Sequence, residues 1–130
     1  MAHFVDTNLV VYAFEPGLKS ERAVEVLADA VISVQVLNEF ANVCIRKMGC
    51  DRALLEQRIS QIRSQICGIE PITEETHDLA REIAFGYKLS FYDSCLIASA
   101  LLADCETFYS EDMQHGLLIE DQLQIINPFL

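Results

Sequence analysis

Four acidic residues stand at positions that suit a shared site, although they are far apart in the chain: Asp6, Glu39, Asp93 and Asp112. Asp6 directly follows the apolar run His3–Val5, and Asp112 comes soon after a second apolar run, Thr107–Tyr109. If both runs are strands of a parallel sheet, their carboxyl ends meet at one edge, where ligands of such sheets gather. An acid in such a place also has a plain structural use as a turn residue or a helix cap.

Glu39 and Asp93 fall on predicted helices rather than at strand ends. Glu39 shares the apolar stripe of a helix predicted over residues 35–47, and burying its charge requires a partner. Asp93 lies near the start of an apolar helix over residues 91–103, where the helix dipole favours an anion. The alternatives are a salt bridge for Glu39 and simple capping for Asp93, and the sequence leaves both open.

The four acids together predict a cation site. No Lys or Arg is adjacent in sequence to any of them. Four carboxylates share one pocket only if most are protonated or if a divalent cation offsets their charge. Oxygen ligands favour Mg²⁺ or Mn²⁺ over zinc or copper. Such an ion orients a water molecule, lowers its pKa and stabilises charge that develops on a phosphate.

The elements that must position these acids alternate along the chain. Strands are predicted at residues 3–5, 30–33, 69–72, 107–109 and 124–127, and helices at 9–14, 20–28, 35–47, 51–66, 73–87 and 91–103. This alternation predicts an α/β fold of three layers with a short central parallel sheet. Without a repeat or a linker rich in Pro, Gly or Ser, residues 1–130 are expected to form one domain.

Composition bounds the class of protein. The chain has no apolar run of the roughly 20 residues that a membrane span needs, so we expect a cytoplasmic protein without a membrane contact. Five cysteines without a CxxC pair are expected to be buried, reduced thiols rather than zinc ligands. The three histidines lack zinc spacing, and neither a Gly-rich phosphate loop nor a GxSxG elbow is present.

The net charge of −11 disfavours nucleic-acid binding, but the charge is unevenly distributed. Residues 46–69 carry five cations against two acids, whereas residues 70–130 carry twelve acids against two cations. The cations of the first segment form a solvated helix face or a grip on RNA backbone, with Arg46, Lys47 and Arg52 as the leading candidates and Arg58 and Arg63 beside them.

Four blocks of sequence resemble the PIN domain, and in particular the VapC-like toxins of toxin–antitoxin pairs. They are residues 4–8 (FVDTN), 36–40 (VLNEF), 89–94 (LSFYDS) and 109–114 (YSEDMQ). The blocks occur in the family's order and cover nearly the whole chain. The ending IINPF at residues 125–129 is also similar to that of the family.

The resemblance implies a PIN-like fold and a metal-dependent endoribonuclease that uses Mg²⁺ or Mn²⁺. It implies that Asp6, Glu39, Asp93 and Asp112 hold the metal, and that hydrolysis leaves a 5′-phosphate and a 3′-hydroxyl. Supporting roles in orienting the carboxylates fall to Thr7, Asn8 and Ser110. Glu111 is adjacent to Asp112, but the family pattern places the acid two residues after the Ser or Thr, which favours Asp112.

The resemblance also implies partners. They are an RNA substrate, a cognate antitoxin whose basic C-terminal segment reaches the acidic pocket, and a second copy of the chain in a homodimer. Two other functions compete with the nuclease. One is a catalytically silent module of the same fold that binds RNA or a protein. The other is a phosphoacceptor receiver domain, which is disfavoured because Asp6-Thr7-Asn8 supplies no acidic pair after the first strand.

Overall fold

The computed structural model describes all 130 residues as twelve elements around one sheet. The strands are β1 (His3–Val5), β2 (Val31–Ser33), β3 (Gly68–Glu70), β4 (Thr107–Tyr109), β5 (Leu118–Ile119) and β6 (Leu123–Ile126). The helices are α1 (Thr7–Phe14), α2 (Ser20–Leu27), α3 (Val34–Arg46), α4 (Arg52–Gln65), α5 (Glu74–Tyr87) and α6 (Phe91–Leu102).

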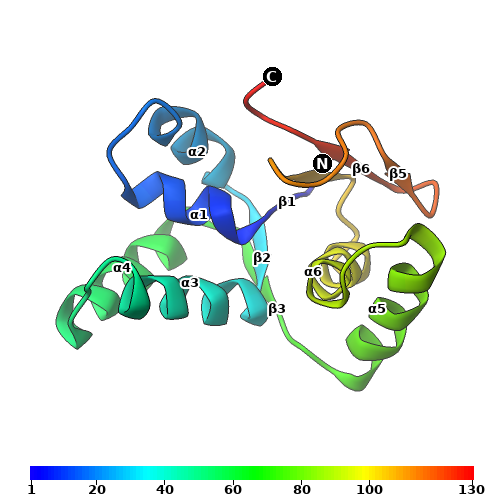
Figure 1. Ribbon diagram of the computed structural model, residues 1–130, viewed down its shortest axis with the longest axis horizontal. Helices are drawn as coiled ribbons and strands as arrows, with labels where there is room; N and C mark the ends of the chain where they lie inside the picture. Colours follow the sequence, from blue (N-terminus) through cyan, green and yellow to red (C-terminus); the bar gives the residue numbers. More distant parts are fainter.

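The sheet has the strand order β3-β2-β1-β4-β6-β5. All neighbouring strands are parallel except β5, which pairs antiparallel with β6. Helices α1 to α4 lie on one side of the sheet, and α5 and α6 lie on the other (Figure 1). The predicted three-layer α/β architecture with a short central parallel sheet is therefore confirmed, and the short antiparallel strand β5 is an addition that was not predicted.

Phe4 of β1 and Phe108 of β4 are register partners at the centre of the sheet, and their stacked rings have centroids 5.2 Å apart. Both side chains are fully buried. On the α3 side, the buried Phe40 packs on Phe14 of α1 with centroids 5.4 Å apart. The aromatic residues thus fix β1, β4, α1 and α3 relative to one another, and these elements carry the predicted site.

Local capping chemistry explains where several helices begin. The side chains of Ser33, Asp51, Thr73 and Ser90 each accept a hydrogen bond from a backbone N–H in the first turn of the helix that follows. The prediction that α4 starts after Asp51 and α6 after Ser90 is confirmed.

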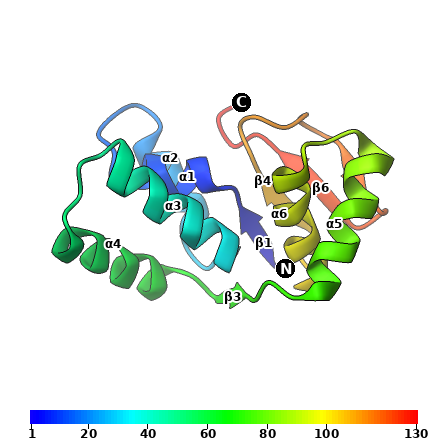
Figure 2. The ribbon, with the colours of Figure 1, turned by 60° about the horizontal axis from the view of Figure 1, so that its bottom comes forward.

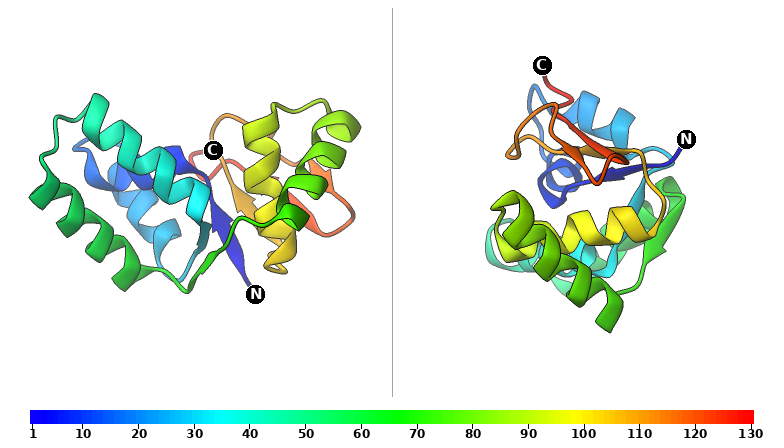
Figure 3. Two further views of the ribbon diagram at one scale, coloured as in Figure 1. Left: turned by 90° about the horizontal axis from the view of Figure 1, so that it is seen from below. Right: turned by 90° about the vertical axis from the view of Figure 1, so that its right-hand side faces the viewer.

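The views in Figures 2 and 3 show α3 and α6 on opposite sides of β1. Ser33 is both the last residue of β2 and the cap of α3, so no loop separates this strand from its helix. Likewise only Asp6 lies between β1 and α1. None of the helices is both long enough and apolar enough to cross a bilayer.

The cysteines are all free, but they are not uniformly buried. Cys44 and Cys105 are buried, Cys50 and Cys95 are half-buried, and Cys67 is exposed. The expectation of buried thiols was therefore wrong for Cys67. This residue precedes β3, which is the strand at one edge of the sheet.

Candidate functional site

Asp6 is the buried centre of the candidate site. It caps α1 from the end of β1, and its Oδ1 accepts the backbone N–H of Thr7 at 2.7 Å. Its Oδ2 accepts the hydroxyl of Ser110 at 2.9 Å, which ties the end of β1 to the segment after β4. Only 7% of Asp6 is exposed. The carboxylate is thus held by two donors, neither of which carries a positive charge.

The pKa of Asp6 is raised from 3.8 to about 6, first because burial disfavours the charged form. The hydrogen bonds from Ser110 and Thr7 act in the opposite direction. The negative charges of Asp93 and Glu39 add to the rise, so both lie near enough for their charges to reach Asp6. The fold therefore brings these three predicted acids, which come from three different elements, to one region.

Glu39 is held toward this region by two neutral donors. Thr7 Oγ1 donates to Glu39 Oε1 at 2.7 Å, and Gln35 Nε2 donates to Glu39 Oε2 at 2.9 Å. Glu39 is half-buried and has no ion-pair partner, so the salt-bridge alternative does not apply. Gln35 was not among the predicted site residues, although its spacing of four residues from Glu39 on a predicted helix was a signal for it.

Asp93 lies in the first turn of α6 and is half-buried. Its own backbone N–H is capped by Ser90 Oγ at 3.2 Å, so the capping role belongs to Ser90 and leaves the Asp93 carboxylate free of it. No side-chain hydrogen bond or ion pair engages the carboxylate. Its position at a helix start is one that the helix dipole makes favourable for an anion.

Asp112 comes from the segment after β4. It is exposed, and its Oδ2 accepts Asn8 Nδ2 at 2.6 Å. The pKa of Tyr12 is raised first by its hydrogen bond with Glu111, and the negative charge of Asp112 adds to the rise. Asn8 therefore attaches Asp112 to the first turn of α1, and its supporting role in a metal site stays a prediction.

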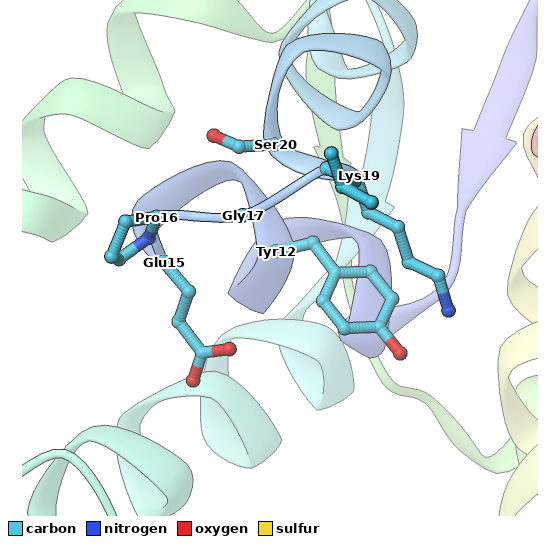
Figure 4. Close-up of a pocket in the computed structure, with 7 residues that line it drawn as sticks. Tyr12, Glu15, Pro16, Gly17, Lys19 and Ser20 are labelled. Atoms are coloured by element: carbon cyan, nitrogen blue, oxygen red, sulfur yellow. The ribbon is translucent and has the colours of Figure 1, made fainter.

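The neighbouring Glu111 has a different task. It forms an ion pair with Lys19, which lowers the pKa of the Glu111 carboxyl. The Lys19 amine also lies 5.1 Å from the centroid of the Tyr12 ring, and Figure 4 shows the amine and the Tyr12 hydroxyl pointing the same way. Because Glu111 already has its cation, the geometry favours Asp112 as the acid that remains available.

None of the four predicted acids is ion-paired. The protein has three ion pairs, which join Lys19 to Glu111, Arg22 to Glu25 and Arg81 to Asp78. The donor set fits a hard divalent cation in its chemistry, since it offers only oxygen ligands and its negative charge is not compensated. As the side chains stand, however, no group of three or more His, Cys, Asp or Glu side chains is close enough together to hold a metal ion.

The basic segment, residues 46–69, begins at the C-terminal end of α3. Arg46 and Arg52 are exposed at the end of α3 and the start of α4, with Lys47 between them. Arg58 does not belong to a solvated face, because its guanidinium carbon lies 5.6 Å from the centroid of the Phe14 ring and its side chain is half-buried. A role of Arg46, Lys47 and Arg52 in binding RNA stays a prediction.

Comparison with known proteins now adds to this geometry. No curated protein matches the chain by sequence. The structure is similar to a toxin–antitoxin complex from Klebsiella pneumoniae, with a TM-score of 0.71, 20% identity and 98% of each chain covered. It is also similar to VapBC2 from Rickettsia felis bound to a DNA fragment from its promoter, with a TM-score of 0.69 and 18% identity over 98% of this chain and 100% of that one.

At these identities the two solved structures establish a shared fold. The family is established independently by sequence, because the model of the PIN domain matches residues 3–116. That range contains all four candidate acids, the four strands β1 to β4 and all six helices, and it ends before β5 and β6. The chain therefore belongs to the PIN domain family.

Proposed function

We propose that this chain is a metal-dependent endoribonuclease and the toxin component of a toxin–antitoxin pair. The observation that carries the proposal is the gathering of Asp6, Glu39 and Asp93 from three elements, with no cation to compensate them. Carboxylates that lie close together without a compensating cation destabilise the folded state. We therefore expect this arrangement to serve a function that requires the negative charge.

The cation would be Mg²⁺ or Mn²⁺, held by Asp6, Glu39 and Asp93 with Asp112 at the rim. When bound, such an ion activates water and stabilises charge on a phosphodiester. The chain's own residues prepare the ligands: Ser110 and the Thr7 N–H orient the Asp6 carboxylate. A bound ion would lower the pKa of Asp6, because it favours the charged form of the carboxyl.

Thr7 makes hydrogen bonds to two of the candidate ligands. Its backbone N–H holds Asp6 at 2.7 Å, and its hydroxyl holds Glu39 at 2.7 Å. One residue therefore sets the positions of two candidate ligands, and it does so as the first residue of α1. Groups that orient metal ligands in this way usually matter almost as much as the ligands themselves.

The partners follow from the same proposal. The two similar structures are a toxin–antitoxin complex and VapBC2 bound to promoter DNA. The excess of acids over residues 70–130 suits an antitoxin with a basic C-terminal segment, since opposite charges steer association. We further propose that the toxin is a homodimer of single-domain chains and that its substrate is RNA.

A catalytically silent PIN module that binds RNA or a protein is the second candidate. The observation that favours it is the spacing of the ligands, because no three of them reach one ion as they stand. The two candidates share the fold and the acidic region. They differ in whether the carboxylates close around a cation when RNA and metal are supplied.

The test is an RNA cleavage assay with purified chain that is free of any antitoxin. Total RNA and a short single-stranded RNA are incubated with Mn²⁺, with Mg²⁺ or with excess EDTA, and the product ends are mapped. We expect cleavage with either metal, a 5′-phosphate on the products, and no cleavage in EDTA. Cleavage that persists in excess EDTA would contradict the proposed mechanism.

A matched pair of variants removes one carboxylate each. Asp93→Asn should abolish cleavage, whereas Asp104→Asn should retain it. Asp104 is an exposed acid just after α6, with a φ of 58° that asparagine adopts readily. If the wild-type chain binds RNA with metal present but never cleaves it, the silent module is the correct function instead.

A further inference from the structure

Three sulfur atoms and one guanidinium meet where α3 turns into α4. Arg58 Nη1 lies 3.3 Å from Cys50 Sγ, 3.6 Å from Met48 Sδ and 3.9 Å from Cys44 Sγ. Cys44 Sγ is also 4.0 Å from Met48 Sδ. The backbone closes the same turn, because Cys50 N–H donates to the carbonyl of Cys44 at 3.0 Å. A single nitrogen atom thus faces two thiols and a thioether.

The turn and the helix together hold the guanidinium in place. Gly49 has a φ of 63°, a conformation that glycine adopts without strain and that lets the chain reverse after α3. Asp51 then caps α4, and Arg58 lies in the second turn of that helix. The Phe14 ring supports the guanidinium, and no carboxylate pairs with it. A half-buried cation without an anionic partner favours negative charge on the atoms that it faces.

This arrangement suits thiol chemistry better than metal binding. Thiols and thioethers are ligands for soft metal ions. A permanently charged guanidinium at the centre of the set repels a cation, and the same group stabilises a thiolate. The cluster is therefore arranged for a cysteine that acts as an anion.

We propose that Cys44 and Cys50 form a peroxide-sensitive thiol pair that closes to a disulfide within the chain. In the first step the Cys50 sulfur, after losing its proton, attacks one oxygen of a hydroperoxide. The O–O bond breaks, the departing oxygen leaves as water or an alcohol after taking up a proton, and Cys50 becomes a sulfenic acid.

In the second step Cys44 loses its proton and its sulfur attacks the sulfur of Cys50. The S–O bond breaks, a second water molecule leaves and the disulfide forms. The two thiols together give up two electrons and two protons, and the peroxide takes up both pairs. With hydrogen peroxide the products are therefore one disulfide and two water molecules.

The surroundings of the two thiols assign their roles. Cys50 is half-buried and is the thiol nearest to Arg58, whereas Cys44 is fully buried. Burial raises the pKa of the Cys44 thiol, which therefore keeps its proton until its partner has been oxidised. Both thiols contact the same Nη1 atom of Arg58. Cys67 offers an internal comparison, because it is exposed but its thiol makes no side-chain hydrogen bond.

The test exposes the full, reduced chain to hydrogen peroxide in the presence of a chelator, followed by alkylation of the remaining thiols and digestion with trypsin. Trypsin cleaves after Arg46, Lys47 and Arg52, so Cys44 and Cys50 fall on separate peptides, residues 23–46 and 48–52. We expect these peptides to appear joined, with the mass of two hydrogens lost. The joined species should form before Cys67 is oxidised.

Three variants distinguish this pair from general oxidation. Cys67→Ser should leave the joining of the peptides unchanged, and Cys50→Ser should abolish it. Arg58→Gln should slow it by on the order of tenfold, because the thiolate loses its stabilising cation. Circular dichroism on each variant checks that the chain remains folded.

The proposal is overturned if Cys67 is oxidised first, or if the Arg58→Gln variant, still folded, joins its peptides as fast as the wild type. It is also overturned if the chain unfolded in urea forms the disulfide as fast as the folded chain, because the fold would then contribute nothing. None of these measurements depends on nuclease activity, so the inference stands or falls independently of the proposed function.

Discussion

Replacing Asp6 with asparagine should make the metal-free protein more stable at neutral pH, although the same change should abolish cleavage. The asparagine has the shape of the aspartate, and its carbonyl oxygen can still accept the Thr7 N–H. Its amide group would face Ser110 Oγ, which can accept where it now donates. The substitution therefore removes the charge and keeps both contacts.

The size of the effect follows from the pKa of Asp6, which burial raises from 3.8 to about 6. Each pKa unit corresponds to about 1.4 kcal/mol, so ionised Asp6 costs the folded state roughly 3 kcal/mol. Below pH 3.8 the carboxyl is protonated in both states and costs nothing. Between pH 3.8 and pH 6 the unfolded chain ionises first, so the cost grows with pH, and above pH 6 it is complete.

The assay measures the unfolding of the wild type and of Asp6→Asn in urea. Unfolding is monitored by circular dichroism, in the presence of EDTA and at several pH values from 4.5 to 8. The stability gained by the variant should be about 1 kcal/mol at pH 4.5, should rise by up to about 1.4 kcal/mol per pH unit until pH 6, and should then level off at roughly 3 kcal/mol through pH 8. Adding Mg²⁺ should narrow the difference, because the ion offsets the charge only in the wild type. A difference that does not change with pH would refute the reasoning.

Glu111→Gln serves as a control, because this substitution should lower the stability at neutral pH whereas Asp6→Asn should raise it. The ion pair with Lys19 lowers the pKa of Glu111, so its carboxylate stabilises the fold at neutral pH, and that contribution is lost as the pH falls through the folded-state pKa. This variant should therefore be less stable than the wild type at pH 8 and should approach it in acid. The free-energy contributions of the Asp6 and Glu111 carboxylates to folding should therefore change with pH in opposite directions.

Three further substitutions test other contacts. Thr7→Val removes the hydroxyl that holds Glu39, so RNA cleavage should fall by on the order of 10- to 100-fold, whereas Thr7→Ser should retain it. Phe40→Ala opens a cavity in the fully buried core and should lower the free energy of unfolding by about 3–5 kcal/mol in urea. Thr73→Ala breaks the capping box with Thr76, so about 1 kcal/mol should be lost and amide exchange should rise in the first turn of α5.

The sequence predicted most of the fold because its signals are local. Apolar runs such as Thr107–Tyr109 coincide with a strand, and capping residues such as Ser90 mark where a helix begins. The strand β5 was not predicted because it has only two residues, one of them exposed, and so short a segment shows no periodic pattern. Its antiparallel pairing is a property of the turn that joins it to β6, where Glu120 and Asp121 adopt positive φ.

The candidate site was predictable in its residues but not in its contacts. Asp6, Glu39 and Asp93 could be identified as acids on inward or strand-end positions, and the family resemblance ordered them. The hydrogen bond between Asn8 and Asp112 could not be read from the sequence, because it depends on how the segment after β4 packs against α1. Arg58 shows the same limit, since its contact with Phe14 joins elements that are remote in sequence.

The direct passage from strand to helix at Ser33 and across Asp6 constrains how this protein can change during evolution. Where an enzyme presents its ligands on loops, insertions and deletions can reshape the active centre at little cost. Here a single residue added between β2 and Glu39 would turn that carboxylate by about 100° around the axis of α3. Divergence of specificity must therefore come from exchanging side chains, or from segments such as residues 110–117 that follow β4, and not from altering the length of these two junctions.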